Sequence, residues 1–218
     1  MATSLIQKPI SQLTLSPGSV VTIADLNWQE LEQVLEEWGE KRHSKIAYCQ
    51  GVLEVMVPLP EHEKNVVILG DIVKLLLNHQ GREWECLRST TYKNELKRVG
   101  IEPDDSFYIE HREAVIGKKR LDLSIDPPPD LAIEVDLTSC TQESAYLALR
   151  VPELWIYAHD QLRIFCLDND GYRESNHSLI FPNVPLKTLI PDTIQTANRR
   201  GISVALKALA AHLKTLEF

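Results

Sequence analysis

Residues 129–136, with the sequence PDLAIEVD, combine apolar side chains with acids in a pattern typical of a buried β-strand. Successive strand side chains alternate between two faces. One face is apolar and carries Leu131, Ile133 and Val135. The other face carries the carboxylates of Asp130, Glu134 and Asp136. Because ionised groups are costly in an apolar sheet unless they are compensated, we expect this acidic face to be the floor of a site, with a divalent metal ion as the simplest compensation.

A second acidic element precedes this strand at residues 102–109, with the sequence EPDDSFYI. Pro103 restricts its start, and the aromatic and β-branched residues that follow favour a strand. If the two strands are neighbours in one sheet, Asp104 approaches Glu134. The sequence therefore predicts that two acids distant in the chain meet at one cation.

Composition limits the class of protein. Of the 218 residues, 44% are hydrophobic and 25% are charged, which is typical of a soluble globular chain with one core. No apolar run reaches the ~18 residues of a membrane span and no secretory leader is visible, so a cytoplasmic location is expected. The formal net charge of −8 argues against a general nucleic-acid coat but is compatible with a local basic patch.

The four cysteines lack the Cys-x-x-Cys spacing of a zinc site and do not indicate a disulfide framework. They are Cys49, Cys86, Cys140 and Cys166.

The periodicity of the chain predicts an α+β (α/β-like) fold, with a central mixed sheet flanked by helices. Residues 1–26 are expected to form an arm and residues 27–218 a single domain. Helices are predicted at about 28–41, 61–78, 142–150 and 202–216. Hairpins are predicted at 45–57 and 113–123, with further strands at 84–96, 102–109, 129–136, 154–157 and 162–167.

Three motifs in this order resemble a known family. They are GIEPDDSFYI, DPPPDLAIEVDLTS and VPELWIY. The Pro103-Asp104 pair followed by a strand with Glu134 resembles the PD-(D/E)XK nuclease arrangement, and the three motifs together are similar to the Uma2 family (DUF820) of restriction-endonuclease-like proteins. The resemblance covers roughly residues 25–170. It implies a restriction-endonuclease-like core and cleavage of DNA with one or two Mg²⁺ or Mn²⁺ ions.

The resemblance also implies roles for individual residues. Asp104 and Glu134 correspond to the metal-binding acids, and the Val135 carbonyl to a backbone ligand. Asp136 stands where the family motif has lysine, so it binds a second metal or accepts the proton of the attacking water. The missing positive charge, and a grip on the phosphate backbone, are expected from the basic set Lys118, Lys119 and Arg120; the alternative is that this set is an ordinary solvated hairpin.

Weaker candidates lie around these positions. The family pattern implies that Glu54 is a third acid and that His62 is a base or a phosphate contact; the alternatives are a solvated strand residue and a helix-capping histidine. Asp130 lies about 13 Å along an extended strand from Glu134 and is better explained as a carboxylate that accepts backbone hydrogen bonds. For Glu134 the alternative is a buried carboxylate paired with an arginine, and for Asp104 an ordinary turn residue.

The leading hypothesis is a metal-dependent endonuclease, active as a two-fold dimer if it cuts both strands of a duplex. One rival is a catalytically inactive nuclease-fold protein that binds nucleic acid or a partner protein. Another is a metal-dependent hydrolase acting on a small phosphate compound.

Overall fold

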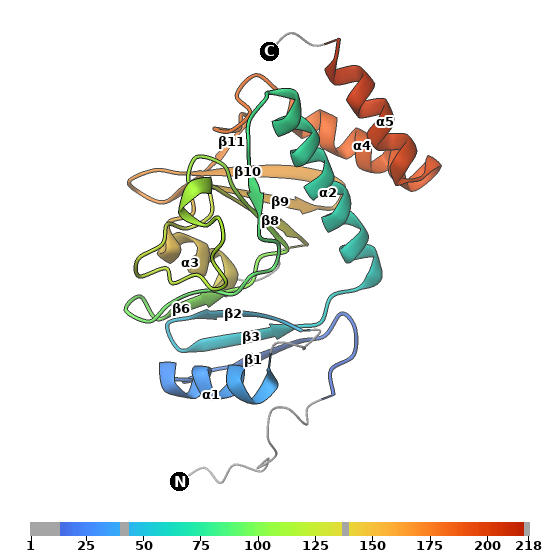
Figure 1. The fold of residues 1–218 in the computed structure, drawn as a ribbon. Coiled ribbons are helices and arrows are strands. Elements are labelled where there is room, and N and C mark those ends of the chain that lie inside the picture. Colours follow the sequence, from blue (N-terminus) through green and yellow to red (C-terminus); the bar gives the residue numbers. More distant parts are fainter. Residues whose placement is uncertain (1–13, 40–43, 137–139, 216–218) are drawn as a thin grey trace.

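The computed structural model describes residues 14–39, 44–136 and 140–215, which form helices around two β-sheets (Figure 1). The α-helices are α1 (Trp28–Trp38), α2 (Pro60–His79), α3 (Cys140–Leu149), α4 (Leu186–Arg200) and α5 (Ile202–Leu213). The strands are β1 (Val20–Ile23), β2 (Lys45–Cys49), β3 (Val52–Met56), β4 (Glu85–Cys86), β5 (Tyr92–Asn94), β6 (Val99–Ile101), β7 (Asp105–Tyr108), β8 (Leu131–Val135), β9 (Glu153–Ala158), β10 (Gln161–Leu167) and β11 (Tyr172–Ser175).

The two sheets differ in topology. The first has five strands in the order β1-β3-β2-β6-β5, and all of its pairs are antiparallel. The second has six strands in the order β11-β10-β9-β8-β7-β4 and is mixed, because β8 and β9 run parallel. The mixed sheet corresponds to the predicted central sheet, and the α+β class is confirmed.

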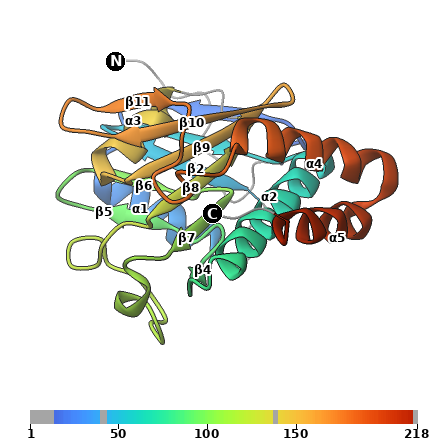
Figure 2. The ribbon, with the colours of Figure 1, turned by 90° about the horizontal axis from the view of Figure 1, so that it is seen from above.

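The helices arrange the molecule in layers. Helix α1 packs on the outer face of the five-stranded sheet, where Leu31 contacts residues of β2 and β3. Helix α3 lies between the two sheets (Figure 1), in a core cluster that includes Tyr146. Helices α2, α4 and α5 gather on the other side of the mixed sheet (Figure 2), around the core residues of β8. The alternation predicted for β8 is confirmed, because its apolar face contacts α2 while Ala132 belongs to the core on the α3 side.

The helices expected at 28–41 and 61–78 and the hairpin expected at 45–57 are present. Helix α1 begins with a capping box in which Asn27 accepts from the Glu30 N–H at 3.0 Å and the Glu30 side chain accepts from the Asn27 N–H at 2.8 Å. The 45–57 segment is a hairpin, since β2 and β3 pair antiparallel. Helix α2 follows the proline break, with Pro60 in its first turn, where the missing N–H costs no helical hydrogen bond.

The hairpin predicted at 113–123 is wrong. Residues 109–130 contain no strand, only turns and a short 3-10 helix at Arg112–Ala114. Carboxylates capture the local backbone donors instead: Asp122 accepts from the Ser124 N–H at 2.9 Å, and Asp126 accepts from the Asp122 N–H at 2.9 Å. Such side-chain bonds compete with a β-ladder for the same N–H groups.

Two further features differ from expectation. Of the strand predicted at 102–109, only Asp105–Tyr108 forms a strand, β7, whereas the preceding β6 ends at Ile101 and belongs to the other sheet. Helix α4 was not predicted from sequence, because Pro191 lies inside it and interrupts the signal of a continuous helix. No helix in the described part of the chain is both long enough and apolar enough to cross a membrane.

Gly70 in α2 lies directly against Asp105 of β7. A Cβ placed on Gly70 would collide with Oδ2 of that buried carboxylate. We therefore predict that Gly70→Ala lowers the free energy of unfolding by about 1–3 kcal/mol, even though alanine is the better helix former. Urea unfolding followed by circular dichroism measures the change. In an Asp105→Ala background the same substitution should cost nothing, and an equal loss in both backgrounds would contradict the proposed collision.

Candidate active site

Asp104 lies where the chain passes from one sheet to the other. The Glu102 N–H donates to the Ile46 carbonyl in β2 at 3.0 Å, so the five-stranded sheet still holds the chain at that point. Two residues later the Asp104 N–H donates to the Ile133 carbonyl in β8 at 3.1 Å. Pro103 stands between them and offers no N–H to either sheet. The crossing therefore places the Asp104 side chain at the seam between the sheets, where it is 1% exposed.

This crossing brings Asp104 and Glu134 together, as the sequence predicts. Strands β7 and β8 pair with Asp105 opposite Ile133, so the next position along places Asp104 opposite Glu134. The Val135 N–H donates to Oδ2 of Asp104 at 2.7 Å, and the charge of Asp104 acts on the neighbouring Glu134 carboxyl. For Val135 the observed contact is thus its N–H, whereas the family pattern implies its carbonyl as a ligand.

Two basic side chains complete the cluster around Asp104. The Lys45 ammonium, from the first residue of β2, forms an ion pair with Oδ1. The His62 ring, from the first turn of α2, places Nε2 3.0 Å from Oδ2. That distance is one of an ion pair, although the ring N–H does not have the direction of a hydrogen bond. His62, predicted as a base or phosphate contact, therefore lies beside the first of the two acids.

Lys45 was missed by sequence reasoning, which sought the cation among residues 118–120. Its signal is present in β2, where it shares a face with Ala47 and Cys49, both buried in the core on the α3 side. A lysine on the inward face of a strand needs a buried acid as partner. The identity of that acid cannot be read from the sequence, because it lies 59 residues away.

The pKa values of the two acids are shifted in opposite directions. Burial raises the pKa of Glu134 well above its usual range, and the negative charge of Asp104 raises it further. Burial alone would also raise the pKa of Asp104, but His62 and the charge of Lys45 outweigh it and hold that pKa below its usual value. Burial would lower the pKa of His62, yet its contact with Asp104 raises it overall. The surroundings therefore disfavour the ionised form of Glu134 and favour the ionised form of Asp104.

Tyr146 holds Glu134 from the side of α3. Its hydroxyl donates to Oε1 of Glu134, and both side chains are fully buried. Burial raises the pKa of Tyr146 well above its usual range, and the adjacent Glu134 adds to the shift, so the phenol keeps its proton. No sequence argument singled out Tyr146, because a tyrosine in a short apolar helix is read as core.

Two predicted acids lie outside this cluster. Asp136 follows the end of β8, has a φ of 55° and is exposed, so it does not continue the acidic face of the strand. Its N–H donates to the Tyr157 carbonyl at 2.9 Å. Glu54 lies in β3 opposite Ala47, on the same face as Lys45. Among the described residues, no hydrogen bond or ion pair joins it to Asp104 or Glu134.

The predicted basic set divides into two parts. Lys118 forms an ion pair with Asp126, which is local to its own loop. Lys119 and Arg120 line a groove of about 1260 Å³ that also contains Lys45. These two basic residues thus share an open surface with the lysine of the Asp104 cluster.

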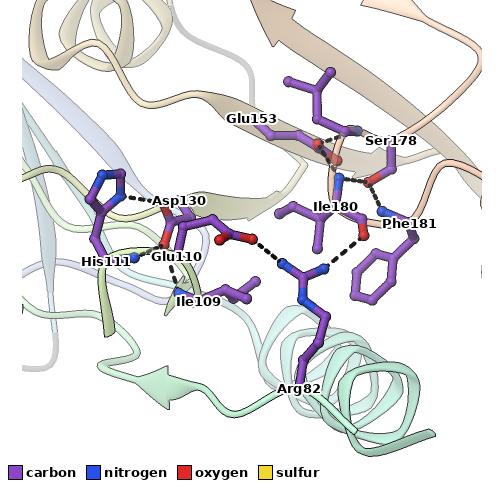
Figure 3. A network of polar contacts seen from close by, with 10 residues as sticks. Arg82, Ile109, Glu110, His111, Asp130, Glu153, Ser178, Ile180 and Phe181 are labelled. Atoms are coloured by element: carbon purple, nitrogen blue, oxygen red, sulfur yellow. Dashed lines mark hydrogen bonds and ion pairs between the residues drawn. The ribbon is translucent and has the colours of Figure 1, made fainter. Parts of the chain in front are cut away.

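Asp130 and Glu153 have structural surroundings (Figure 3). Asp130 accepts from the backbone N–H groups of Ile109 at 2.6 Å and His111 at 3.1 Å, as expected of a carboxylate that binds backbone donors. Glu153, in the VPELWIY motif, accepts from the N–H groups of Leu179 at 2.7 Å and Ile180 at 3.3 Å. Both carboxylates tie loops to the mixed sheet.

The acid pair suits a hard divalent cation. Mg²⁺ is usually bound by one or two carboxylates and keeps several waters. Asp104 and Glu134 offer two adjacent carboxyl groups, and both ring nitrogens of buried His62 lack a hydrogen-bond partner in the described part of the chain. Within those same residues no group of three or more Asp, Glu, His or Cys side chains is arranged to hold a metal. The residues therefore fit a two-carboxylate site rather than a closed protein cage.

The helices and the two β-sheets of the described residues define an α+β protein. Residues 28–200 match the model of the Uma2 family, described as "Putative restriction endonuclease", and the chain belongs to that family. A crystal structure of a "putative nuclease belonging to DUF820" from Anabaena variabilis is similar with a TM-score of 0.46 and 13% identity, covering 74% of this chain and 90% of that one. No curated protein matches the chain.

The opposite pKa shifts of the two acids lead to a prediction about stability. Glu134→Gln should change the free energy of unfolding by less than about 1 kcal/mol, because burial disfavours the charged form of Glu134 and a glutamine carbonyl still accepts from Tyr146. Asp104→Asn should cost more, about 1–3 kcal/mol, since it removes the charge with which Lys45 is paired. Chemical denaturation at pH 7 measures both, and equal costs would contradict the different surroundings of the two acids.

Proposed function

We propose that the chain is a metal-dependent endonuclease that hydrolyses DNA phosphodiester bonds, with Mg²⁺ or Mn²⁺ held by Asp104 and Glu134. The observation that carries the proposal is the meeting of these two acids at the seam of the sheets, beside a lysine and an open groove. Membership in the Uma2 family supports a nucleic acid as the substrate.

Each residue of the cluster has a role in this proposal. A bound divalent ion supplies Lewis acidity and lowers the pKa of a bound water. Asp104 and Glu134 bind and orient that ion, and Tyr146 fixes the Glu134 carboxyl by its hydrogen bond. Asp136 stands at the motif position of the lysine and cannot provide its positive charge. Lys45 supplies that charge instead and stabilises the negative charge that develops on the phosphate. His62, buried beside Asp104, orients that carboxylate through the Oδ2 contact.

The groove provides a path for the phosphate backbone. Lys45, Lys119 and Arg120 line it together with the hydroxyl side chains of Ser89, Thr90 and Thr91. Lysine, arginine and hydroxyl groups are the usual donors to phosphate oxygens. The groove also contains Glu32, Glu36, Glu63 and Glu102, so the proposed phosphate contacts are those of Lys45, Lys119 and Arg120 individually.

A binding protein without catalysis is the second candidate. It is favoured by the exposed Asp136 at the motif lysine position and by the internal partners of both acids, since Asp104 is paired with Lys45 and Glu134 with Tyr146.

Cleavage of both strands by one site per chain would favour a two-fold dimer. We place the activity in the cytoplasm, where DNA and Mg²⁺ are both available.

The nuclease proposal predicts cleavage of plasmid DNA in the presence of Mn²⁺ or Mg²⁺ and none with EDTA. Asp104→Asn and Glu134→Gln should each reduce the rate on the order of 100-fold or more, because each replaces a carboxyl ligand of the metal by an amide. Gel assays with supercoiled and single-stranded substrates measure the rates. Asp136→Asn is the matched control and should retain activity, because Asp136 lies outside the cluster.

Two outcomes would redirect the proposal. Mn²⁺ and DNA binding without cleavage in the wild type would favour the non-catalytic binding protein. Hydrolysis of nucleotides but not of polymers would favour a hydrolase of small phosphate compounds.

The groove predicts a difference between adjacent lysines. Lys119→Gln should weaken DNA binding and reduce the slope of log K against log salt concentration by about 0.9, as expected for one lost phosphate contact. Lys118→Gln should leave the slope unchanged, because Lys118 is paired with Asp126. Fluorescence anisotropy at several salt concentrations measures both. The same slope change in the two variants would contradict the placement of DNA in this groove.

A further inference from the structure

Asp104 has no oxygen that is left without a partner. Oδ1 is in an ion pair with the Lys45 ammonium. Oδ2 accepts from the Val135 N–H at 2.7 Å and lies 3.0 Å from Nε2 of His62. Of these partners, the backbone donor is fixed by the pairing of the strands and the histidine by the first turn of α2. A cation that binds Asp104 must therefore compete with Lys45.

Lys45 has an alternative place for its ammonium. It is the first residue of β2, and its side chain is 15% exposed rather than enclosed. It lines the groove that also contains Lys119 and Arg120. A lysine side chain is a long, flexible stem with a compact charge, so its head can move while the backbone stays in the sheet. The groove is where the proposed function places the phosphate backbone.

We propose that Lys45 is an internal competitor of the metal ion at Asp104 and that DNA relieves this competition by drawing the lysine into the groove. The inference rests on the proposed function and adds a mode of regulation to the same site. Without DNA, Lys45 neutralises Asp104 and weakens metal binding. With DNA, a phosphate accepts the ammonium, and Asp104 becomes available to a divalent cation.

The consequence is positive coupling between the two ligands. Both ligands favour the same position of Lys45, away from Asp104. Phosphate accepts the ammonium in the groove, and the divalent cation takes its place beside Asp104. Two ligands that favour one state of a protein strengthen each other's binding by the same factor. The enzyme would then hold its metal weakly until nucleic acid is present.

Isothermal titration calorimetry of the 218-residue chain with Mn²⁺ tests the first half of the proposal. Lys45→Met keeps the length of the side chain and removes the charge, and it should tighten Mn²⁺ binding at least about fivefold. Lys45→Arg keeps the charge and should bind Mn²⁺ as weakly as the wild type. Lys93→Met is the matched control: Lys93 also lines the groove, but its ammonium is paired with Glu32 at 2.6 Å, so the Mn²⁺ affinity should stay within about twofold.

A second titration, in the presence of a duplex oligonucleotide with uncleavable phosphorothioate linkages, tests the coupling. The duplex should tighten Mn²⁺ binding at least about fivefold in the wild type and in Lys93→Met, and should have no such effect in Lys45→Met. Melting temperatures with and without Mn²⁺ show whether each variant is folded and give the same order of affinities. An unchanged or weaker Mn²⁺ affinity in folded Lys45→Met would overturn the proposal.

The Asp104→Asn variant separates this inference from the proposed function. Loss of Mn²⁺ binding in Asp104→Asn, together with unchanged binding in Lys45→Met, would refute the competition and leave the metal site supported. Wild-type Mn²⁺ binding by Asp104→Asn would refute both.

Discussion

The passage of the chain between the two sheets at Pro103 and Asp104 is the constraint on which the site depends. Glu102 is still hydrogen-bonded to the first sheet and Asp104 is already hydrogen-bonded to the second. Because proline offers no N–H, the change of partner occurs within a single residue and without a loop. The acid that follows is therefore buried at the seam, where one strand from each sheet and the start of α2 converge.

A buried acid pair is tolerated here because the surroundings of its members differ. Lys45 and His62 hold the pKa of Asp104 below its usual value, whereas burial and the charge of Asp104 raise the pKa of Glu134. Two neighbouring ionised carboxylates would repel each other in a buried site that screens charge poorly. A divalent metal ion bound to Asp104 would have to take over the role of the Lys45 ammonium as its counter-ion. The contacts that stabilise the site are therefore the same contacts that metal binding would change.

Features that depend on residues close together in the sequence could be predicted, whereas features that depend on residues far apart could not. Local signals were sufficient for the first helix and for the alternation of β8, because these depend on neighbours a few residues apart. Family motifs identified Asp104 and Glu134. Lys45 could not be assigned, since its partner depends on how β2 and β6 pair. The 113–123 segment was misread because side-chain carboxylates, rather than a second strand, bind its N–H groups.

The position of α3 between the sheets has a consequence for how such proteins diverge. This helix lies between the two sheets, and its buried side chains pack in one cluster with residues of both (Figure 1). Lys45 belongs to β2 of the first sheet and Glu134 to β8 of the second. A bulkier or smaller residue on α3 would change the spacing between the sheets and, with it, the reach of the lysine. We therefore expect that, among related proteins, a larger residue on α3 is accompanied by a smaller residue on the sheet that it packs against. The spacing between the sheets would then stay constant while the individual residues vary.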